Sequence, residues 1–106
     1  MVKVRNIEEL MENIAPSNLK ENWDNVGLQA GNPESVVSGV LLSLDLTSKV
    51  IEEAESLGCN LIITHHPLLL EPVKKIVSGD PVSDMLISLI SGNISFFCAH
   101  TNLDKA

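Results

Sequence analysis

Three apolar segments alternate with two segments of helical periodicity in the second half of the chain. The apolar segments span residues 37–47, 60–66 and 94–104, and each contains a run of Val, Leu, Ile or Phe. Residues 47–58 and 80–93 lie between them and have the amphipathic pattern of helices. Strand, helix, strand, helix, strand in this order predicts an α/β fold, with a mainly parallel sheet joined by crossover helices.

The ends of both crossover helices are marked by residues that suit helix termini. Thr47 or Ser48 can cap the first helix, and Gly58 stands where it should stop. Asp80 can cap the second helix, and Gly92 stands at its end. The apolar segment 37–47 is nearly continuous, which predicts a strand covered on both faces.

A further helix is predicted at the N-terminus, over residues 5–16. Asn6 can cap it, and its apolar side chains fall on one face: Ile7, Leu10, Met11 and Ile14. Residues 17–35 are rich in Asn, Gly and Ser, so we expect an irregular segment there. This segment holds the only tryptophan, Trp23, which suits either a core plug or a stacking platform for a planar ring.

Length and composition limit the classes of protein to which the chain can belong. Its 106 residues fit one α/β domain, residues 1–106, and 44% of them are hydrophobic, which argues for an ordered core. The formal net charge of −7 argues against a nucleic-acid partner. No apolar run is long enough to span a membrane. Neither Cys59 nor Cys98 belongs to a CxxC pair, so we expect reduced thiols in a cytoplasmic protein.

The predicted topology gathers all three histidines at one edge of the sheet. The second strand ends at His65 and His66, and the third runs into a loop that contains His100 and Asp104. Asp45 lies near the end of the first strand. Because the carboxyl ends of parallel strands share one edge, where ligands bind in such sheets, these side chains should lie together. Imidazole and carboxylate ligands suit zinc, iron, manganese or nickel.

The residues of this edge leave several roles open. At a strand end followed by Pro67, we expect the imidazoles of His65 and His66 to be splayed, with one ligand for each of two ions. Alternatively, one histidine caps a backbone carbonyl and the other is solvated. Asp104 is a metal ligand or a turn carboxylate, and His100 is a ligand, a proton carrier or a residue that orients a ligand. Asp45 either caps the following helix or accepts a hydrogen bond from a ligating histidine.

Four segments in this order resemble the NIF-three-like family, also described as GTP cyclohydrolase 1 type 2 homologs. They are "WDNVGLQAG", "SLDLTSKVIEEA", "LIITHHPLLL" and "AHTNLDKA". The resemblance covers nearly the whole chain and implies one lobe of a two-lobed α/β fold with a dinuclear metal site. It also implies that His65, His66 and Asp104 bind the metals, and that the protein assembles as a toroidal hexamer.

The chain departs from the pattern of the family in one respect. The remaining ligands of the family lie in a C-terminal His-x-x-x-Glu segment, which this chain does not contain. We therefore expect the chain to be the N-terminal part of a longer architecture, with an incomplete site.

Two functions follow as hypotheses. One is a metal-dependent hydrolase of a nucleotide-like substrate, with His100 as the catalytic proton carrier. The alternative is a non-catalytic metal-binding or regulatory interaction module.

Overall fold

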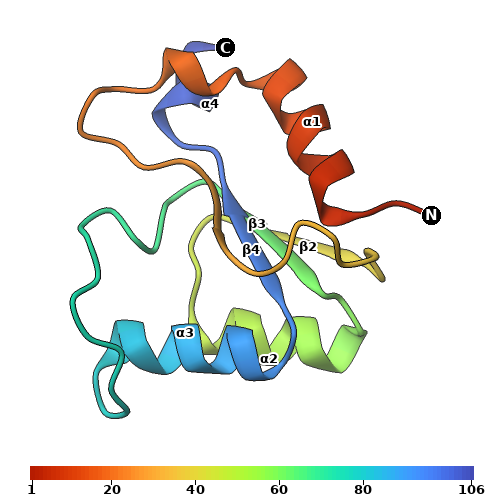
Figure 1. Cartoon of the computed structure of the whole chain (residues 1–106), viewed down its shortest axis with the longest axis vertical. Coiled ribbons are helices and arrows are strands. Elements are labelled where there is room, and N and C mark those ends of the chain that lie inside the picture. The colour runs from red at the N-terminus through yellow and green to blue at the C-terminus, as the bar shows by residue number, and fades with distance from the viewer.

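A computed structural model describes all 106 residues and contains one four-stranded sheet with the strand order β1-β4-β3-β2 (Figure 1). The strands are β1 (Gly27–Ala30), β2 (Val40–Ser43), β3 (Leu61–Thr64) and β4 (Ser95–Cys98). The helices are α1 (Val4–Ile14), the 3₁₀ turn η1 (Ser17–Leu19), α2 (Ser48–Leu57), α3 (Pro81–Ser91) and α4 (Thr101–Lys105).

The parallel part of the sheet confirms the predicted α/β alternation. Strands β2 and β3 pair in parallel with Val40 opposite Leu61, and β3 and β4 pair in parallel with Leu61 opposite Ser95. Helix α2 connects β2 to β3, and α3 connects β3 to β4. The carboxyl ends of all three strands therefore lie along one edge of the sheet, as the sequence predicts.

Strand β1 is the element that the sequence analysis missed. It lies within the segment expected to be irregular and pairs antiparallel with β4, with Gly27 opposite Cys98. Its four residues are all half-buried, and glycines with positive φ stand at its start and directly after its end. A strand this short, in an Asn- and Gly-rich context, owes its conformation to pairing with β4 rather than to local propensity.

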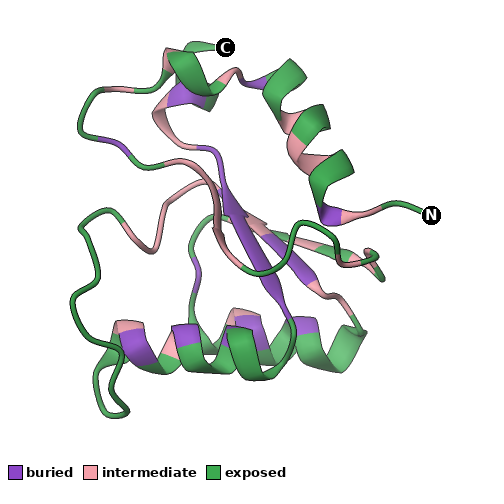
Figure 2. Cartoon of the chain, viewed as in Figure 1, coloured by how far each residue is buried: buried purple, intermediate pink, exposed green.

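The two faces of the sheet are covered by different helices (Figures 1 and 2). Helices α2 and α3 lie side by side under one face and enclose the larger apolar cluster, whose buried members include Ile51, Ile62, Leu89 and Phe96. Helix α1 contributes to a smaller cluster around Leu61, Phe97 and Ala99. The buried strands β3 and β4 lie between these layers.

Helix α1 differs from its prediction in two respects. It begins at Val4, so Asn6 is not the cap; its Oδ1 instead accepts a hydrogen bond from the backbone N–H of Lys3 at 2.8 Å. Ile7 and Met11 pack against the smaller cluster, but Leu10 and Ile14 are each 52% exposed. The helix therefore contacts the sheet through a narrower stripe than the sequence pattern suggested.

The crossover helices have the predicted ends. The side chain of Thr47 caps α2, and Gly58 follows the helix in the left-handed conformation with φ +71°. The side chain of Asp80 caps α3, which begins at Pro81 and is followed by Gly92. Residues 67–79 form no helix or strand.

Two other expectations are wrong. Strand β2 is not covered on both faces: it lies at the edge of the sheet, with Leu42 72% exposed. The segment after β4 is not a loop but the short helix α4, tied down by the buried side chain of Asn102, which donates to the carbonyl of Ala15 at 2.9 Å. None of the helices has the length and apolar character that crossing a bilayer requires.

Candidate metal centre

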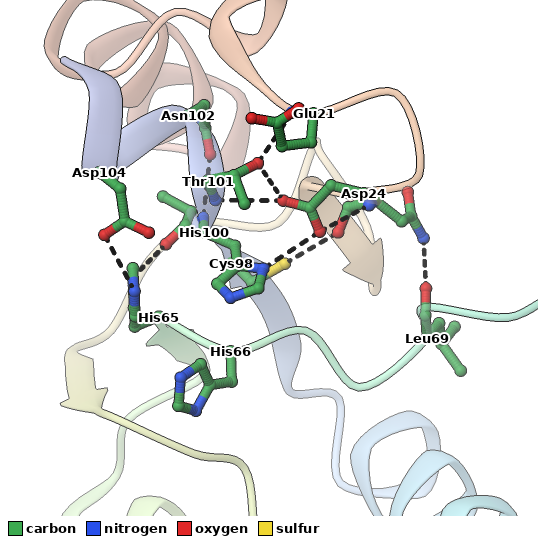
Figure 3. A network of polar contacts seen from close by, with 12 residues as sticks. Glu21, Asp24, His65, His66, Leu69, Cys98, His100, Thr101, Asn102 and Asp104 are labelled. Atoms are coloured by element: carbon green, nitrogen blue, oxygen red, sulfur yellow. Dashed lines mark hydrogen bonds and ion pairs between the residues drawn. The ribbon is translucent and has the colours of Figure 1, made fainter.

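All three histidines of the chain converge at the carboxyl edge of the sheet (Figure 3). One ligand atom from each of His65, His66 and His100 lies within 4.8 Å of those from the other two. The ring centroids are 5.2 Å apart for His65 and His66, 5.2 Å for His65 and His100, and 5.4 Å for His66 and His100. This set, here called the histidine cluster, can hold a metal ion.

The ends of two adjacent strands produce this convergence. Strand β3 ends at Thr64, so His65 and His66 lie beyond the regular strand and escape its alternation of faces. His100 follows the end of β4 at Cys98. We expected the two neighbouring imidazoles to be splayed apart. They lie together instead, with planes tilted by 44°.

Each histidine engages its Nδ1 atom in a hydrogen bond with an oxygen. Nδ1 of His65 lies 2.8 Å from the carbonyl oxygen of Ala99, and Nδ1 of His66 lies 2.5 Å from Oδ1 of Asp45. Nδ1 of His100 lies 3.2 Å from Oδ1 of Asp24. Carbonyl and carboxylate oxygens accept, so each Nδ1 donates, and a neutral ring then has its lone pair on Nε2. This is the arrangement of metal-ligating histidines in proteins.

Asp45 takes the second of the two roles considered for it. Helix α2 is capped by Thr47, whose Oγ1 accepts from the backbone N–H of Val50 at 3.2 Å. The carboxylate of Asp45 is thereby free of the helix end and holds the imidazole of His66.

Asp24 is a site residue that the sequence analysis did not identify. Its side chain has no exposed surface, yet it carries a carboxylate. Oδ2 accepts hydrogen bonds from the backbone N–H of Thr101 at 3.1 Å and from the Thr101 hydroxyl at 2.5 Å. Burial raises the pKa of this carboxyl, but hydrogen bonds from Thr101, His100 and Asn25 outweigh burial, and the net pKa is lowered. Asp24 is therefore a buried, ionised acceptor.

Asp104, the third metal ligand predicted from the sequence, contacts the cluster through His65. Its Oδ1 lies 3.3 Å from Nε2 of His65, and its side chain is 60% exposed. Since Nδ1 of His65 donates to a carbonyl, a neutral His65 would face the carboxylate with a lone pair. Nε2 of His65 and Oδ1 of Asp104 therefore lie close enough to bind one cation between them.

Trp23 lies beside the cluster rather than in the core. Its ring is 6.1 Å from that of His100 in an edge-on arrangement, and the residue is 59% exposed. Exposure rules out the role of core plug. It leaves an aromatic surface next to the histidine cluster, as a stacking platform would require.

The two cysteines take no part in the cluster as ligands. Both are free thiols, with Cys98 buried and Cys59 half-buried. Burial raises the pKa of the Cys98 thiol to about 12, with a further contribution from the negative charge of Asp24. A thiol with this pKa stays protonated near neutral pH and is a poor metal ligand.

The fold and this edge together define a class: a mixed α/β domain with a histidine cluster where its parallel strands end. A family model described as Duf34/NIF3 (NGG1p interacting factor 3) matches residues 2–106, and the chain belongs to this family. The chain is 44% identical over 104 residues to a GTP cyclohydrolase 1 type 2 homolog from Clostridium acetobutylicum, and 45% identical to one from Clostridium perfringens.

Solved structures show the same fold. The chain is similar to a crystal structure of a Bacillus cereus protein related to NIF3, with a TM-score of 0.92 and 37% sequence identity. The alignment covers 97% of this chain and 28% of that one. The two clostridial relatives align over 98% of this chain, which spans only 39% and 40% of their lengths. The resemblance inferred from the four sequence segments is thereby confirmed at the level of the family and the fold.

Proposed function

We propose that this chain provides metal ligands for a metal-dependent hydrolase that acts on a nucleotide-like substrate. His65, His66 and Asp104 would hold divalent metal, two ions in a complete site, and His100 would carry the proton. One observation carries the proposal. In all three histidines Nδ1 is hydrogen-bonded to an oxygen, so that the lone pair for a metal lies on Nε2.

Electrostatics support a cation at this place. The chain has a formal net charge of −7, and three carboxylates contact the cluster, one on each histidine: Asp104, Asp45 and Asp24. The nearby Lys105 is paired with Glu21 at 2.6 Å. A cation between Asp104 and His65 would be bound by Oδ1 and Nε2, which lie 3.3 Å apart. When bound, a divalent metal supplies Lewis acidity, which activates water near neutral pH and polarises the bond under attack.

The choice of a nucleotide-like substrate rests on two supports. The relatives carry the name GTP cyclohydrolase 1 type 2 homolog, and the exposed ring of Trp23 next to His100 offers a surface on which a planar base can stack. The protein as a whole would be a homo-oligomer, which the family resemblance predicts to be a hexamer.

Metal content and GTP turnover test the proposal. The purified chain should contain divalent metal by elemental analysis, and His65→Ala/His66→Ala should lose it. Lys74→Ala/Lys75→Ala is the matched control, because it removes two adjacent exposed side chains from the loop after the histidine pair and should keep the metal. Equal metal content in wild type and the histidine variant would contradict the site.

GTP turnover then separates the two functions. Turnover that appears with added divalent metal and disappears with a chelator supports the hydrolase. Bound metal without turnover of GTP would contradict the hydrolase and favour a non-catalytic metal-binding or interaction module.

A further inference from the structure

The hydrogen bonds of Asp24 point to a role that reaches beyond its own loop. Asp24 lies between η1 and β1, and its carboxylate is fully enclosed. One oxygen accepts from Nδ1 of His100, and the other accepts twice from Thr101. A carboxylate that has lost its proton can only accept, so its contact with His100 fixes which ring nitrogen carries the hydrogen.

We propose that Asp24 is a positioning residue, which holds His100 as the Nδ1–H tautomer so that Nε2 presents a lone pair to the space shared with His65 and His66. This inference rests on the proposed function and deepens it, because a histidine that takes a proton or binds a metal there needs that lone pair.

The surroundings of Asp24 make its orientation fixed rather than adjustable. Oδ1 also accepts from the backbone N–H of Asn25 at 2.9 Å, so both oxygens face a main-chain donor that cannot turn away. The hydroxyl of Thr101 is held in turn, because it accepts from the backbone N–H of Glu21 at 2.9 Å. The carboxylate is therefore locked between two backbone segments, and His100 must adapt to it.

The backbone of His100 is also held, and its ring has an aromatic neighbour. Its backbone N–H donates to Oδ1 of Asn102 at 2.9 Å, which ties the residue to the start of α4. Trp23 meets the ring edge-on, with centroids 6.1 Å apart. With Nδ1 placed against Asp24, this partner decides whether Nε2 offers a lone pair or a hydrogen.

Replacing Asp24 by asparagine would break this arrangement with little change in shape. The amide NH₂ must take the place of one oxygen. At the Oδ1 position it would donate towards Nδ1 of His100 and so favour the tautomer with hydrogen on Nε2, and the backbone N–H of Asn25 would lose its acceptor. At the Oδ2 position it would face the backbone N–H of Thr101, which cannot become an acceptor.

Nitrogen NMR of metal-free protein labelled at histidine tests the inference directly. In wild type, His100 should show the Nδ1–H tautomer at a pH where it is neutral, and Asp24→Asn should shift its population towards Nε2–H. Glu21→Gln is the matched control: it makes the same carboxylate-to-amide change in the same loop, but the Glu21 side chain pairs with Lys105 and should leave His100 unchanged.

A titration with Zn²⁺ alone gives the second readout. With Zn²⁺ alone and no substrate, all three imidazoles of the histidine cluster can hold the ion, His100 included, so Asp24→Asn should weaken binding about tenfold or more. Glu21→Gln should bind as wild type does. A purely structural role for Asp24 would lower stability without moving the tautomer of His100.

The inference and the proposed function fail in different ways. An Nε2–H tautomer of His100 in the wild-type protein overturns the inference and needs no variant, so the test survives if Asp24→Asn does not fold. An unchanged tautomer in a folded Asp24→Ala, which offers Nδ1 of His100 no carboxylate, also overturns it. A wild type that binds no Zn²⁺ but has His100 as Nδ1–H contradicts the proposed function and supports the inference.

Discussion

The three histidines at the carboxyl edge each have an oxygen as the partner of Nδ1, but these oxygens come from different groups. His65 uses a backbone carbonyl, whereas His66 and His100 use the carboxylates of Asp45 and Asp24. All three oxygens accept from Nδ1, so in each neutral ring the lone pair that can bind a metal lies on Nε2. The backbone partner, Ala99, directly follows β4, and its N–H donates to the carbonyl of Thr64 at the end of β3, so the position of the His65 ring depends on the pairing of β3 with β4 as well as on the side chains.

Cys98 lies at the same edge, and burial lowers the reactivity of its thiol. This predicts different reaction rates for the two thiols of the chain. Cys98 is completely buried with a pKa of about 12, whereas Cys59 is half-buried. Because the thiolate is the reactive form, one thiol should react readily with a thiol reagent near pH 8, and the second only after unfolding in urea. Cys59→Ser should remove the fast reaction. Equal reaction rates for both thiols in the folded protein would contradict the burial of Cys98.

At the scale of elements, β1 is the strand whose position depends most on close contact. It continues into Gly31, where a Cβ atom would lie 2.2 Å from Oγ and 2.6 Å from Cα of Ser95. The turn after β1 therefore passes directly over the start of β4, and only glycine fits. The loop that holds Asp24 leads into this strand, so the contact also contributes to the site.

Comparison of two glycine variants measures this contact. Gly31 and Gly79 have similar positive φ values, +119° and +103°, but a Cβ at Gly79 meets nothing within 4 Å. Both alanine variants bear backbone strain of about 1–3 kcal/mol. Gly31→Ala adds a collision worth about 1–3 kcal/mol, so it should lose more free energy of unfolding than Gly79→Ala in urea denaturation. Equal losses would show that the turn does not press on β4.

For the molecule as a whole, the most conspicuous feature is the open edge of the sheet at β2. This strand has no charged residue and lies at the end of the strand order. Two of its apolar side chains, Val40 and Leu42, are exposed, and so is Leu44 directly after it. Sheet edges in monomeric proteins are usually protected by charges, prolines or bulges. An unprotected apolar edge favours contact with another copy of the chain.

Self-association should therefore depend on this edge. We predict that sedimentation velocity shows oligomers whose fraction rises with protein concentration, and that Leu42→Lys lowers that fraction, because it places a charge in the middle of the edge. Ser56→Lys makes the same change of charge on an exposed position of α2 and should behave as wild type does. A wild type that remains monomeric at every concentration would be the contrary result.

Sequence alone determined the parallel part of the fold and its functional edge. Periodicity and caps located α2 and α3, and the alternation of strands and helices placed His65, His66 and His100 at one edge, because parallel strands end together. The four segments of the resemblance identified the family that the comparisons then showed. These features were predictable because they depend on local pattern and topology.

Tertiary structure alone decided the strand β1, the exposure of Trp23 and the partner of His100. Asp24 and His100 are 76 residues apart, and they meet only because β1 pairs antiparallel with β4 and brings its preceding loop to the same edge. No local signal marks such a contact, since its free energy comes from a hydrogen bond and a burial that exist only in the folded chain. The roles of His65, His66, His100 and Asp104 in metal binding and catalysis stay predictions of this site.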